Sequence, residues 1–266
     1  MNNSNMSKTT IIIQARIGSR RFPRKVISKI QGDYMISHII KRLKYAKFAE
    51  QIILATTKKE EDKILLEIAK KENIFLFAGN EKDVLKRYFL CAKKFDADPI
   101  IRITGDCPLC DPKIIQKMIK KFNRKKYDYI SNRINPSFPD GLDVEIFSFK
   151  ALRKAEREAK LKSQREHVTS YIYENKKKFS IFNLKNKKDL SELRWTVDEK
   201  KDLQFVKKIY QKMSPKKIFY MHDVLEVLKK NPEFSKINNN IIRDEGYMIS
   251  KKNDNKISRT KNIVKR

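Results

Sequence analysis

The stretch Thr10-Ile-Ile-Ile-Gln-Ala-Arg-Ile-Gly-Ser-Arg-Arg-Phe-Pro-Arg-Lys25 decides the fold of this chain. Its apolar run, Ile11 to Ile13, predicts a buried strand, and the loop after it is rich in arginine around Gly18 and Ser19. In open α/β sheets, ligands bind at the carboxyl ends of the strands. Guanidinium groups and closely approaching backbone N–H groups suit a polyphosphate. Residues 14–25 are therefore a candidate nucleoside triphosphate site, with a solvated basic loop as the alternative.

The composition limits the classes of partner. The 266 residues carry a formal net charge of +30, which is compatible with nucleic-acid binding. However, lysine pairs recur on every predicted helix, and the arginine–aromatic platform of single-strand binders is absent from the sequence. We therefore expect an attraction for acidic ligands and do not expect nucleic acid as a partner.

The location of the protein is also predicted from composition. No stretch approaches the length and apolarity of a membrane helix, and the first ten residues lack the apolar core of a secretory signal. The three cysteines give an odd count without a disulfide framework. We expect a cytoplasmic protein.

Short apolar runs alternate with amphipathic ones along the first half of the chain. Strands are predicted at 11–13, 51–56, 74–77 and 99–103, and helices at 34–48, 60–72 and 82–93. Another helix is expected to begin at Asp111-Pro112, because aspartate is a good N-cap and proline fits the first turn. This order predicts a layered parallel sheet with helices on both faces.

The second half of the chain is less regular. Strands are predicted at 127–131, 142–147, 179–184 and 193–197, and helices at 149–160, 164–174, 200–210 and 222–230. Residues 251–266 are basic and nearly without apolar periodicity, which predicts a flexible tail.

Two aspartates follow predicted strands and are candidates for a metal. Asp106 comes just after the strand at 99–103, across Gly105, and Asp198 just after the one at 193–197. Mg²⁺ is usually held by one or two carboxylates together with substrate phosphates. The alternatives are a turn or cap aspartate for Asp106 and an ordinary helix N-cap for Asp198.

Further polar residues are candidates for binding a second substrate. Asp143 and Glu145 lie two apart on a predicted strand, so they share a face that could hold sugar hydroxyls; the alternative is the polar outside of an edge strand. Arg165 and His167 lie together on a predicted helix, where His167 could bind a carboxylate or hydroxyl, act as a base, or be structural. Cys107 and Cys110 form a C-x-x-C motif, which indicates either a redox pair or small side chains in a tight turn.

Three separated motifs resemble one known family. Ala15-Arg-x-Gly-Ser-x-Arg-x-Pro-x-Lys25, Gly105-Asp-x-Pro-Leu109 and Val197-Asp-x-x-x-Asp-Leu203 look like the nucleotide loop and the two metal aspartates of the CMP-sugar synthetases, which activate sialic acids and 3-deoxy-manno-octulosonate. Phe138-Pro-Asp-Gly-Leu-Asp-Val-Glu145, Arg165-Glu-His-Val-Thr169 and Leu193-Arg-Trp-Thr-Val-Asp198 are most similar to the spore-coat polysaccharide branch. The resemblance covers roughly residues 9–250.

The resemblance implies a three-layer α/β/α nucleotide-diphospho-sugar transferase-like fold with a mixed, mostly parallel sheet. It implies a disordered segment 1–8, a cytidylyltransferase domain 9–213, a helical extension 214–250 and the flexible tail 251–266. It implies that CMP passes from CTP to a sugar acid or related sugar for cell-surface polysaccharide synthesis, with CTP and the sugar as partners and a homodimer left open. A related glycosyltransferase, a sugar-1-phosphate nucleotidylyltransferase and a non-enzymatic nucleic-acid-binding protein are the alternatives.

The resemblance also implies roles for single residues. Arg16, Lys25 and Asp106 would be catalytic, and Asp106 and Asp198 would bind Mg²⁺. The remaining predicted site residues form two sets. CTP would be bound by Ala15, Arg16, Ser19, Arg20, Lys25, Arg102 and Gly105, and the acceptor would be bound by Asp140, Asp143, Glu145, Arg165 and His167. Arg21 and Arg24 are interpreted as part of the basic background.

Overall fold

The fold is that of a computed structural model, which describes residues 7–263 and their side chains as far as Asp254. The disorder predicted for 1–8 falls mostly outside the described residues, and Lys8 begins the first strand, β1 (Lys8–Gln14). A seven-stranded sheet forms the centre, in the order β5-β4-β1-β6-β8-β7-β9. Its other strands are β4 (Gln51–Thr57), β5 (Phe75–Gly79), β6 (Ala97–Thr104), β7 (Tyr129–Ser131), β8 (Glu145–Phe147) and β9 (Ile181–Asn183).

The sheet is mixed and mostly parallel, as predicted. β1 pairs in parallel with β4 and β6, so that Ile12 lies between Ile53 and Arg102. Only β8 is antiparallel, to β6 on one side and β7 on the other. The carboxyl ends of β1 and β6 therefore meet at one edge, where the predicted nucleotide loop and Asp106 begin.

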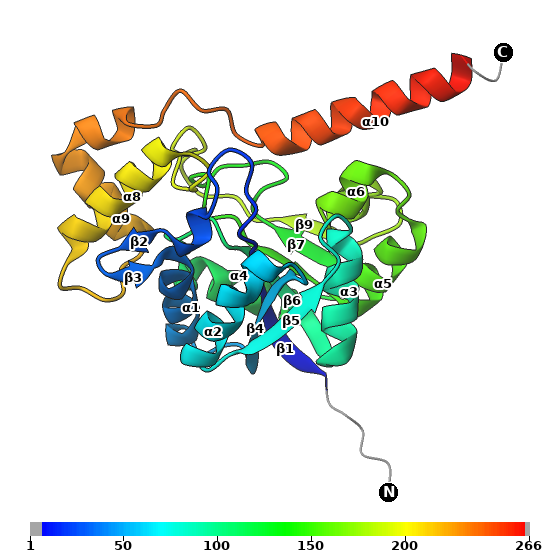
Figure 1. Ribbon diagram of the computed structural model, residues 1–266, viewed down its shortest axis with the longest axis horizontal. Coiled ribbons are helices and arrows are strands. Elements are labelled where there is room, and N and C mark those ends of the chain that lie inside the picture. The colour runs from blue at the N-terminus through cyan, green and yellow to red at the C-terminus, as the bar shows by residue number, and fades with distance from the viewer. Residues whose placement is uncertain (1–6, 264–266) are drawn as a thin grey trace, which may run out of the picture.

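Alternating burial along β1 explains why helices cover both faces. Ile11 and Ile13 belong to one buried cluster and Ile12 to another, and all three side chains are fully buried. The first cluster includes residues of α1 (Met35–Tyr45), α2 (Lys63–Lys71), α4 (Pro112–Arg124) and α8 (Lys200–Met213), and the second includes residues of α3 (Val84–Lys94) and α5 (Phe149–Glu158). Figure 1 shows the sheet between these two sets of helices, which confirms the three layers.

The remaining elements lie around this centre. They are η1 (Lys25–Ile27), the small sheet of β2 (Lys29–Ile30) and β3 (Asp33–Tyr34), η2 (Glu60–Asp62), α6 (Lys162–Glu166), α7 (Ser170–Glu174), α9 (Met221–Lys230), η3 (Pro232–Lys236) and α10 (Glu245–Ile263). α10 runs outward from the body of the protein (Figure 1). Among residues 7–263, no helix combines the length and apolarity needed to cross a membrane.

The structure corrects several predicted elements. The strand predicted at 193–197 is wrong: a single bridge joins Arg194 to Asp140, although Trp195 and Val197 are buried. The strand predicted at 142–147 is reduced to β8, and the helix predicted at 164–174 is two short helices separated at Val168, where φ is 61°. Helix α10 continues to Ile263, where irregular chain was predicted from residue 251. The division into domains stays a prediction.

Candidate functional site

Gly105 lets the end of β6 approach the start of the nucleotide loop. Its backbone N–H donates to the carbonyl oxygen of Gln14 at 2.8 Å. A Cβ atom on Gly105 would lie 2.8 Å from Cβ of Ala15, which is closer than carbon atoms pack. The two small residues of the predicted nucleotide site thus bring the loops after β1 and β6 together at one edge of the sheet.

The ammonium of Lys25 joins the two predicted metal aspartates. Its Nζ atom donates to Oδ1 of Asp198 at 2.8 Å, to Oδ2 of Asp106 at 3.2 Å and to the carbonyl oxygen of Val197 at 2.8 Å. The Val197 N–H in turn donates to the Asp106 carbonyl oxygen at 2.8 Å, which holds the two segments side by side. The structure therefore brings Lys25, Asp106 and Asp198 together.

The ion pairs between Lys25 and the two aspartates determine the charge states of these side chains. Burial alone would raise the pKa of the Asp106 carboxyl, but the Lys25 ammonium and a hydrogen bond from Thr104 outweigh it and lower that pKa to about 2. Burial likewise opposes the charge on Lys25, but Asp106 and Asp198 raise the pKa of the ammonium above its usual value. Near neutral pH, Lys25 is therefore protonated and Asp106 is ionised.

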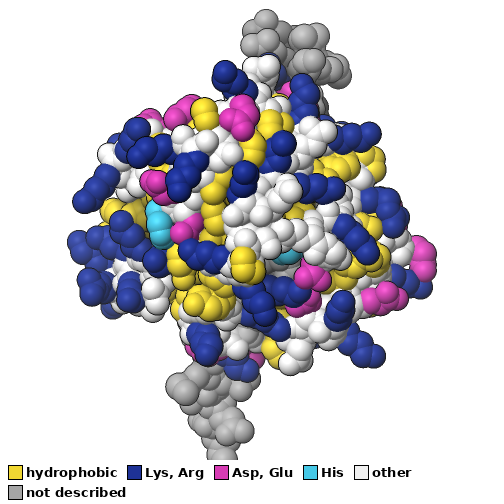
Figure 2. Space-filling view, turned by 90° about the vertical axis from the view of Figure 1, so that its left-hand side faces the viewer, with side chains coloured by type: hydrophobic (Ala, Val, Ile, Leu, Met, Phe, Trp, Pro, Cys, Tyr) yellow, Lys and Arg dark blue, Asp and Glu magenta, His cyan; other side chains and the backbone are white. Residues whose placement is uncertain are grey.

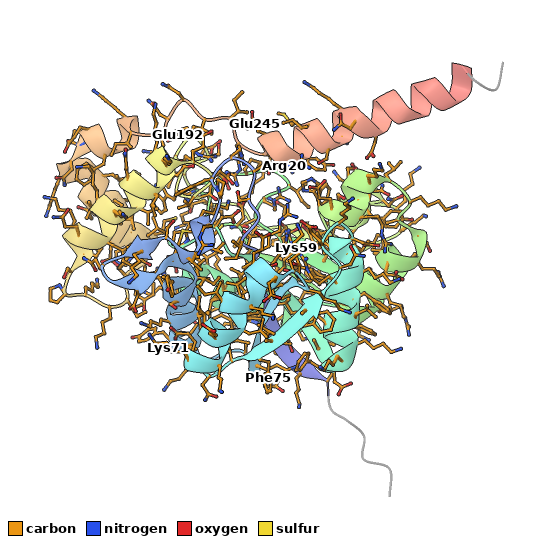
Figure 3. All side chains as sticks on the ribbon, in the orientation of Figure 1. Arg20, Lys59, Lys71, Phe75, Glu192 and Glu245 are labelled. Atoms are coloured by element: carbon orange, nitrogen blue, oxygen red, sulfur yellow. The ribbon has the colours of Figure 1, made fainter. Side chains whose placement is uncertain are left out.

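The other loop cations are arranged differently from the prediction. Arg21, interpreted above as background, places Nη2 3.0 Å from Oδ1 of Asp198. Arg16 is half-buried and contacts Glu81 at 3.4 Å, whereas Arg20 is exposed and has no ion-pair partner among the side chains described, residues 7–254. Figure 3 labels Arg20 where the loop comes near Glu245, at the start of α10. The signal that could have found Arg21 is the quoted motif itself, because its second fixed arginine falls two residues after Ser19.

Ser19 and Arg102 have partners inside the protein. The Ser19 N–H donates to the carbonyl oxygen of Ile17 at 2.8 Å, which tightens the loop. Arg102 is buried on β6 and pairs with Glu145 and, at 3.2 Å, with Gln14. Arg102 thus lies below the nucleotide loop, already held by a carboxylate.

Arg194 organises the segment that carries Asp198. Its guanidinium lies 3.0 Å from carboxylate oxygens of Asp140, Asp198 and Asp202. Asp202 also accepts the backbone N–H groups of Asp198 and Glu199 at 2.9 Å each, and so caps α8. These contacts fix the position of Asp198, and the N-cap of α8 is Glu199 rather than Asp198, with Asp202 completing a capping box from the third helical position.

Asp140 and Asp143 lie together on the loop before β8. Asp143 pairs with Arg243 at 2.6 Å and with Arg133 at 3.8 Å, while Arg243 lies 3.9 Å from Asp140. Burial, followed by the negative charge of Asp143, raises the pKa of Asp140 to about 7. Arg133 and Arg243 were not singled out from the sequence, since their partners are distant along the chain.

Glu145 does not share a face with Asp143 on a strand. Asp143 precedes β8, whereas Glu145 begins it and is buried under Arg102, Thr169 and the hydroxyl of Tyr129, which donates at 2.5 Å. Burial would raise the pKa of Glu145, but Arg102 and Arg133 outweigh it and lower that pKa. The alternative of a polar outside of an edge strand is wrong for Glu145, which is buried on an interior strand of the sheet. Asp143 is half-buried on the preceding loop, and the binding of sugar hydroxyls by these two residues stays a prediction.

Arg165 and His167 contact different parts of the protein. The guanidinium of Arg165, on α6, contacts Asp83 at 2.6 Å and Glu156 at 3.3 Å, and so ties α6 to the start of α3. His167 instead faces α10, with Nε2 3.2 Å from Oγ of Ser250. The structure therefore does not bring Arg165 to the aspartates of the acceptor side.

The C-x-x-C segment is buried beside Asp106. Burial raises the pKa of the Cys107 thiol well above its usual value and that of Cys110 to about 11. Raised thiol pKa values disfavour the thiolate that redox chemistry needs. The segment fits a tight turn of small side chains.

Comparison with known proteins identifies the fold and the family of the chain. The fold resembles that of a CMP:2-keto-3-deoxy-manno-octonic acid synthetase solved with CTP, with a TM-score of 0.59 at 16% identity over 77% of this chain and 99% of that one. The cytidylyltransferase family model matches residues 10–245. The chain belongs to the cytidylyltransferase family, and it is thus an enzyme of the nucleotidyltransferase class.

Individual relatives match over nearly their whole length. A cytidylyltransferase from Leptospira borgpetersenii gives a TM-score of 0.84 at 36% identity, covering 89% of this chain and 99% of that one. The uncharacterised protein MJ1063 of Methanocaldococcus jannaschii is 37% identical over 89% of this chain and 96% of its own. The spore coat polysaccharide biosynthesis protein SpsF of Bacillus subtilis is 30% identical over 86% and 97%, respectively.

Proposed function

We propose that the protein transfers CMP from CTP to a sugar acid or related sugar acceptor and releases pyrophosphate, in the synthesis of a cell-surface polysaccharide. The observation that carries this proposal is the convergence of Lys25, Asp106 and Asp198 at the carboxyl edge of the sheet, beside the arginine-rich loop. The names of relatives, which include 3-deoxy-manno-octulosonate cytidylyltransferases matched over about two fifths of this chain, support a sugar acid.

Mg²⁺ is the proposed cofactor, and the donor set fits it. Asp106 and Asp198 direct carboxylate oxygens at one point, and hard divalent cations prefer oxygen ligands. Within the described residues, no group of three or more His, Cys, Asp or Glu side chains could hold a metal alone. Two carboxylates completed by substrate phosphates and water are the usual arrangement for Mg²⁺. When bound, Mg²⁺ would polarise the α-phosphate of CTP.

The residues of the chain would then position the reactants. A hydroxyl oxygen of the sugar attacks the α-phosphorus of CTP and its proton passes to water. The bond from the α-phosphorus to the oxygen shared with the β-phosphate breaks, and pyrophosphate leaves with that electron pair. Such transfers depend on positioning and on neutralising charge rather than on covalent chemistry by the protein. Arg16, Arg20 and Lys25 would hold the triphosphate and stabilise the leaving pyrophosphate, within reach of backbone N–H groups near Ser19.

The acceptor would bind near Asp140, Asp143 and His167. Asp140 and Asp143 can accept hydrogen bonds from sugar hydroxyls when the Arg243 guanidinium moves away from them. Glu145 and Arg165, also predicted for the acceptor, are already paired inside the protein and would support the site indirectly. Location in the cytoplasm and a homodimer stay predictions.

Family membership favours this function over the related glycosyltransferase or sugar-1-phosphate nucleotidylyltransferase. For the nucleic-acid alternative, Figure 2 shows Lys and Arg side chains spread over the visible face rather than gathered in one patch. The deciding experiment is pyrophosphate release with CTP, ATP, GTP and UTP, each against a panel of sugar acids, neutral sugars and sugar phosphates. Release that needs CTP and a sugar acid supports the proposal; release with another nucleotide, or none with any acceptor, contradicts it.

Asp106→Asn tests the metal role within the same assay. Removing one charged ligand from such a centre is expected to lower kcat by about two orders of magnitude or more. Thermal stability is also expected to fall, because the buried Lys25 ammonium loses a carboxylate partner, so kcat is measured at a temperature where the variant is folded. Asp33→Asn is the matched control, because Asp33 pairs with Lys41 on the surface. Full activity of Asp106→Asn would remove Asp106 from the mechanism.

A further inference from the structure

The ammonium of Lys25 has no donor left for a phosphate. A protonated lysine has three N–H donors, and those of Lys25 go to Asp106, Asp198 and the carbonyl oxygen of Val197. The residue is also buried, at 8% exposure. Lys25 therefore cannot bind the triphosphate from this position, and it stands where a cation shared by the two aspartates would stand.

Arg21 occupies the same carboxylate oxygen. Its guanidinium lies 3.0 Å from Oδ1 of Asp198, the atom that Lys25 contacts at 2.8 Å. The other oxygen of Asp198 is held separately, by Arg194 at 3.0 Å. Two cations from the nucleotide loop thus cover the side of Asp198 that faces Asp106, while a third keeps the carboxylate in place.

The net charge around Asp106 and Asp198 stays balanced only if a divalent cation replaces the charges of Lys25 and Arg21. The carboxylates of Asp106 and Asp198 are matched by the single charges of Lys25 and Arg21. A divalent cation entering beside them would face like-charge repulsion, which is strong in a site of low dielectric constant. If Lys25 and Arg21 leave as the divalent cation enters, the balance is restored, and both side chains become free for a polyphosphate.

We propose that Lys25 and Arg21 are stand-in cations at the metal site, and that they exchange places with a divalent metal when a triphosphate binds. The triphosphate takes up both side chains as they leave the aspartates, so metal and nucleotide bind together and each binds weakly alone. Lys25 and Arg21 are thus positioning residues that keep the aspartates paired until both ligands arrive. The inference rests on the proposed function for the metal site at Asp106 and Asp198 and for the identity of the triphosphate.

The test measures metal binding without any reaction. Mn²⁺ takes the same oxygen ligands, and its free fraction can be followed by electron paramagnetic resonance. Without nucleotide, Lys25→Met is expected to bind Mn²⁺ at least about tenfold more tightly than the wild type, because the competing charge is gone. Arg21→Met is expected to shift affinity in the same direction by less, since Arg21 is more exposed and is shared with Glu245.

Two controls keep the result specific. Lys41→Met removes a lysine that pairs with Asp33 on the surface, and its Mn²⁺ affinity is expected to equal that of the wild type. Adding Asp106→Asn to Lys25→Met is expected to abolish the gained affinity. If Lys25→Met does not fold, the test is the Mn²⁺ affinity of Arg21→Met compared with that of the wild type. Equal or weaker Mn²⁺ binding in the variant that folds overturns the exchange.

A second arm adds CTP to the wild type. CTP is expected to strengthen Mn²⁺ binding to the wild type markedly, and much less to Lys25→Met, whose site is already open. Equal strengthening in both proteins overturns the coupling. If CTP changes neither protein while the nucleotide-free difference remains, the stand-in role holds and the proposed use of CTP fails, which separates the two claims.

Discussion

Gly141 lies so close to Thr196 that a Cβ atom at position 141 would be 2.4 Å from the Thr196 backbone nitrogen. The contact joins the loop that carries Asp140 to the segment that carries Asp198. Asp140 and the 193–195 segment also share two backbone hydrogen bonds, one from Asp140 to Leu193 at 2.8 Å and one from Trp195 to Asp140 at 2.6 Å. The acceptor side and the metal side are therefore built on one tight backbone contact.

Gly141→Ala is expected to destabilise the protein. The residue has a φ of 103°, which disfavours any side chain, and the added methyl group meets rigid backbone. We expect Tm to fall by at least about 4 °C in thermal unfolding. Gly32→Ala separates the two causes, because Gly32 has a φ of 88° but open space around it. An equal loss in both variants would show that close packing at Gly141 contributes nothing.

Arg20→Ala is expected to weaken CTP binding without changing stability. Arg20 is exposed and has no ion-pair partner among the described side chains, which reach Asp254, so its guanidinium can meet a phosphate. Losing one charge-assisted contact should raise the CTP dissociation constant by about 10-fold or more, measured by calorimetry with Mg²⁺. Arg153→Ala, on the exposed side of α5, is the matched control. An unchanged constant for Arg20→Ala would assign the triphosphate contacts to Arg16, Arg21 and Lys25.

The raised pKa of Asp140 makes stability depend on pH. Its pKa is about 7 in the folded protein, because it is buried beside Asp143, and about 3.9 when unfolded. Between these values the folded state binds more protons, so this group makes the free energy of unfolding fall as pH rises from about 4 to about 7. Asp106 has the opposite effect on the free energy of unfolding, and it acts at lower pH. Because its pKa is about 2 in the folded protein, it contributes stability that is lost as the pH falls from about 4 towards 2.

Asp140→Asn isolates this contribution. Urea unfolding at about pH 5 and about pH 8 should show that the variant loses less stability on raising the pH than the wild type does. Parallel changes in the two proteins would mean that Asp140 titrates near its ordinary value.

Arg165→Ala is expected to affect stability rather than catalysis. Its guanidinium is engaged by Asp83 and Glu156, which tie α6 to α3. We expect Tm to fall by about 2–4 °C while kcat/KM for the acceptor stays within about twofold. A much larger loss of kcat/KM at unchanged Tm would restore Arg165 to the acceptor site, as the sequence motif implies.

Local patterns predicted those parts of the fold that depend on near neighbours. The run Ile11 to Ile13 is buried on both faces and forms an interior strand of the sheet, and Asp111 caps α4 by accepting the Lys113 N–H at 2.7 Å, as expected. The segment at 193–197 shows the limit of this approach. Trp195 and Val197 are buried like strand residues, but their N–H groups bond to Asp140 and Asp106 in loops. Apolar alternation reports burial, and it does not report which backbone is the partner.

The candidate site was predictable where motifs mark strand ends and unpredictable where pairing is long-range. Asp106 and Asp198 meet as predicted, since each follows a segment that reaches the same edge of the sheet. Arg133 and Arg243 gained their importance from partners far along the chain, and one sequence gives no measure of that proximity. Arg21 differs from them, because the motif of the nucleotide loop already contains it. The engagement of Arg102 and Arg165 with internal carboxylates was hidden for the same reason.

The hydrogen bond from Val197 to Asp106 joins two segments that are far apart in the chain and are therefore made at different times during synthesis. The first half of the chain can complete most of the parallel strands, but it leaves Asp106 without its partner until residues 194–202 have been made and have folded back. Contacts between such distant parts of a chain form late in folding. A nascent or truncated chain that ends before this segment would contain the nucleotide loop but would have no second aspartate.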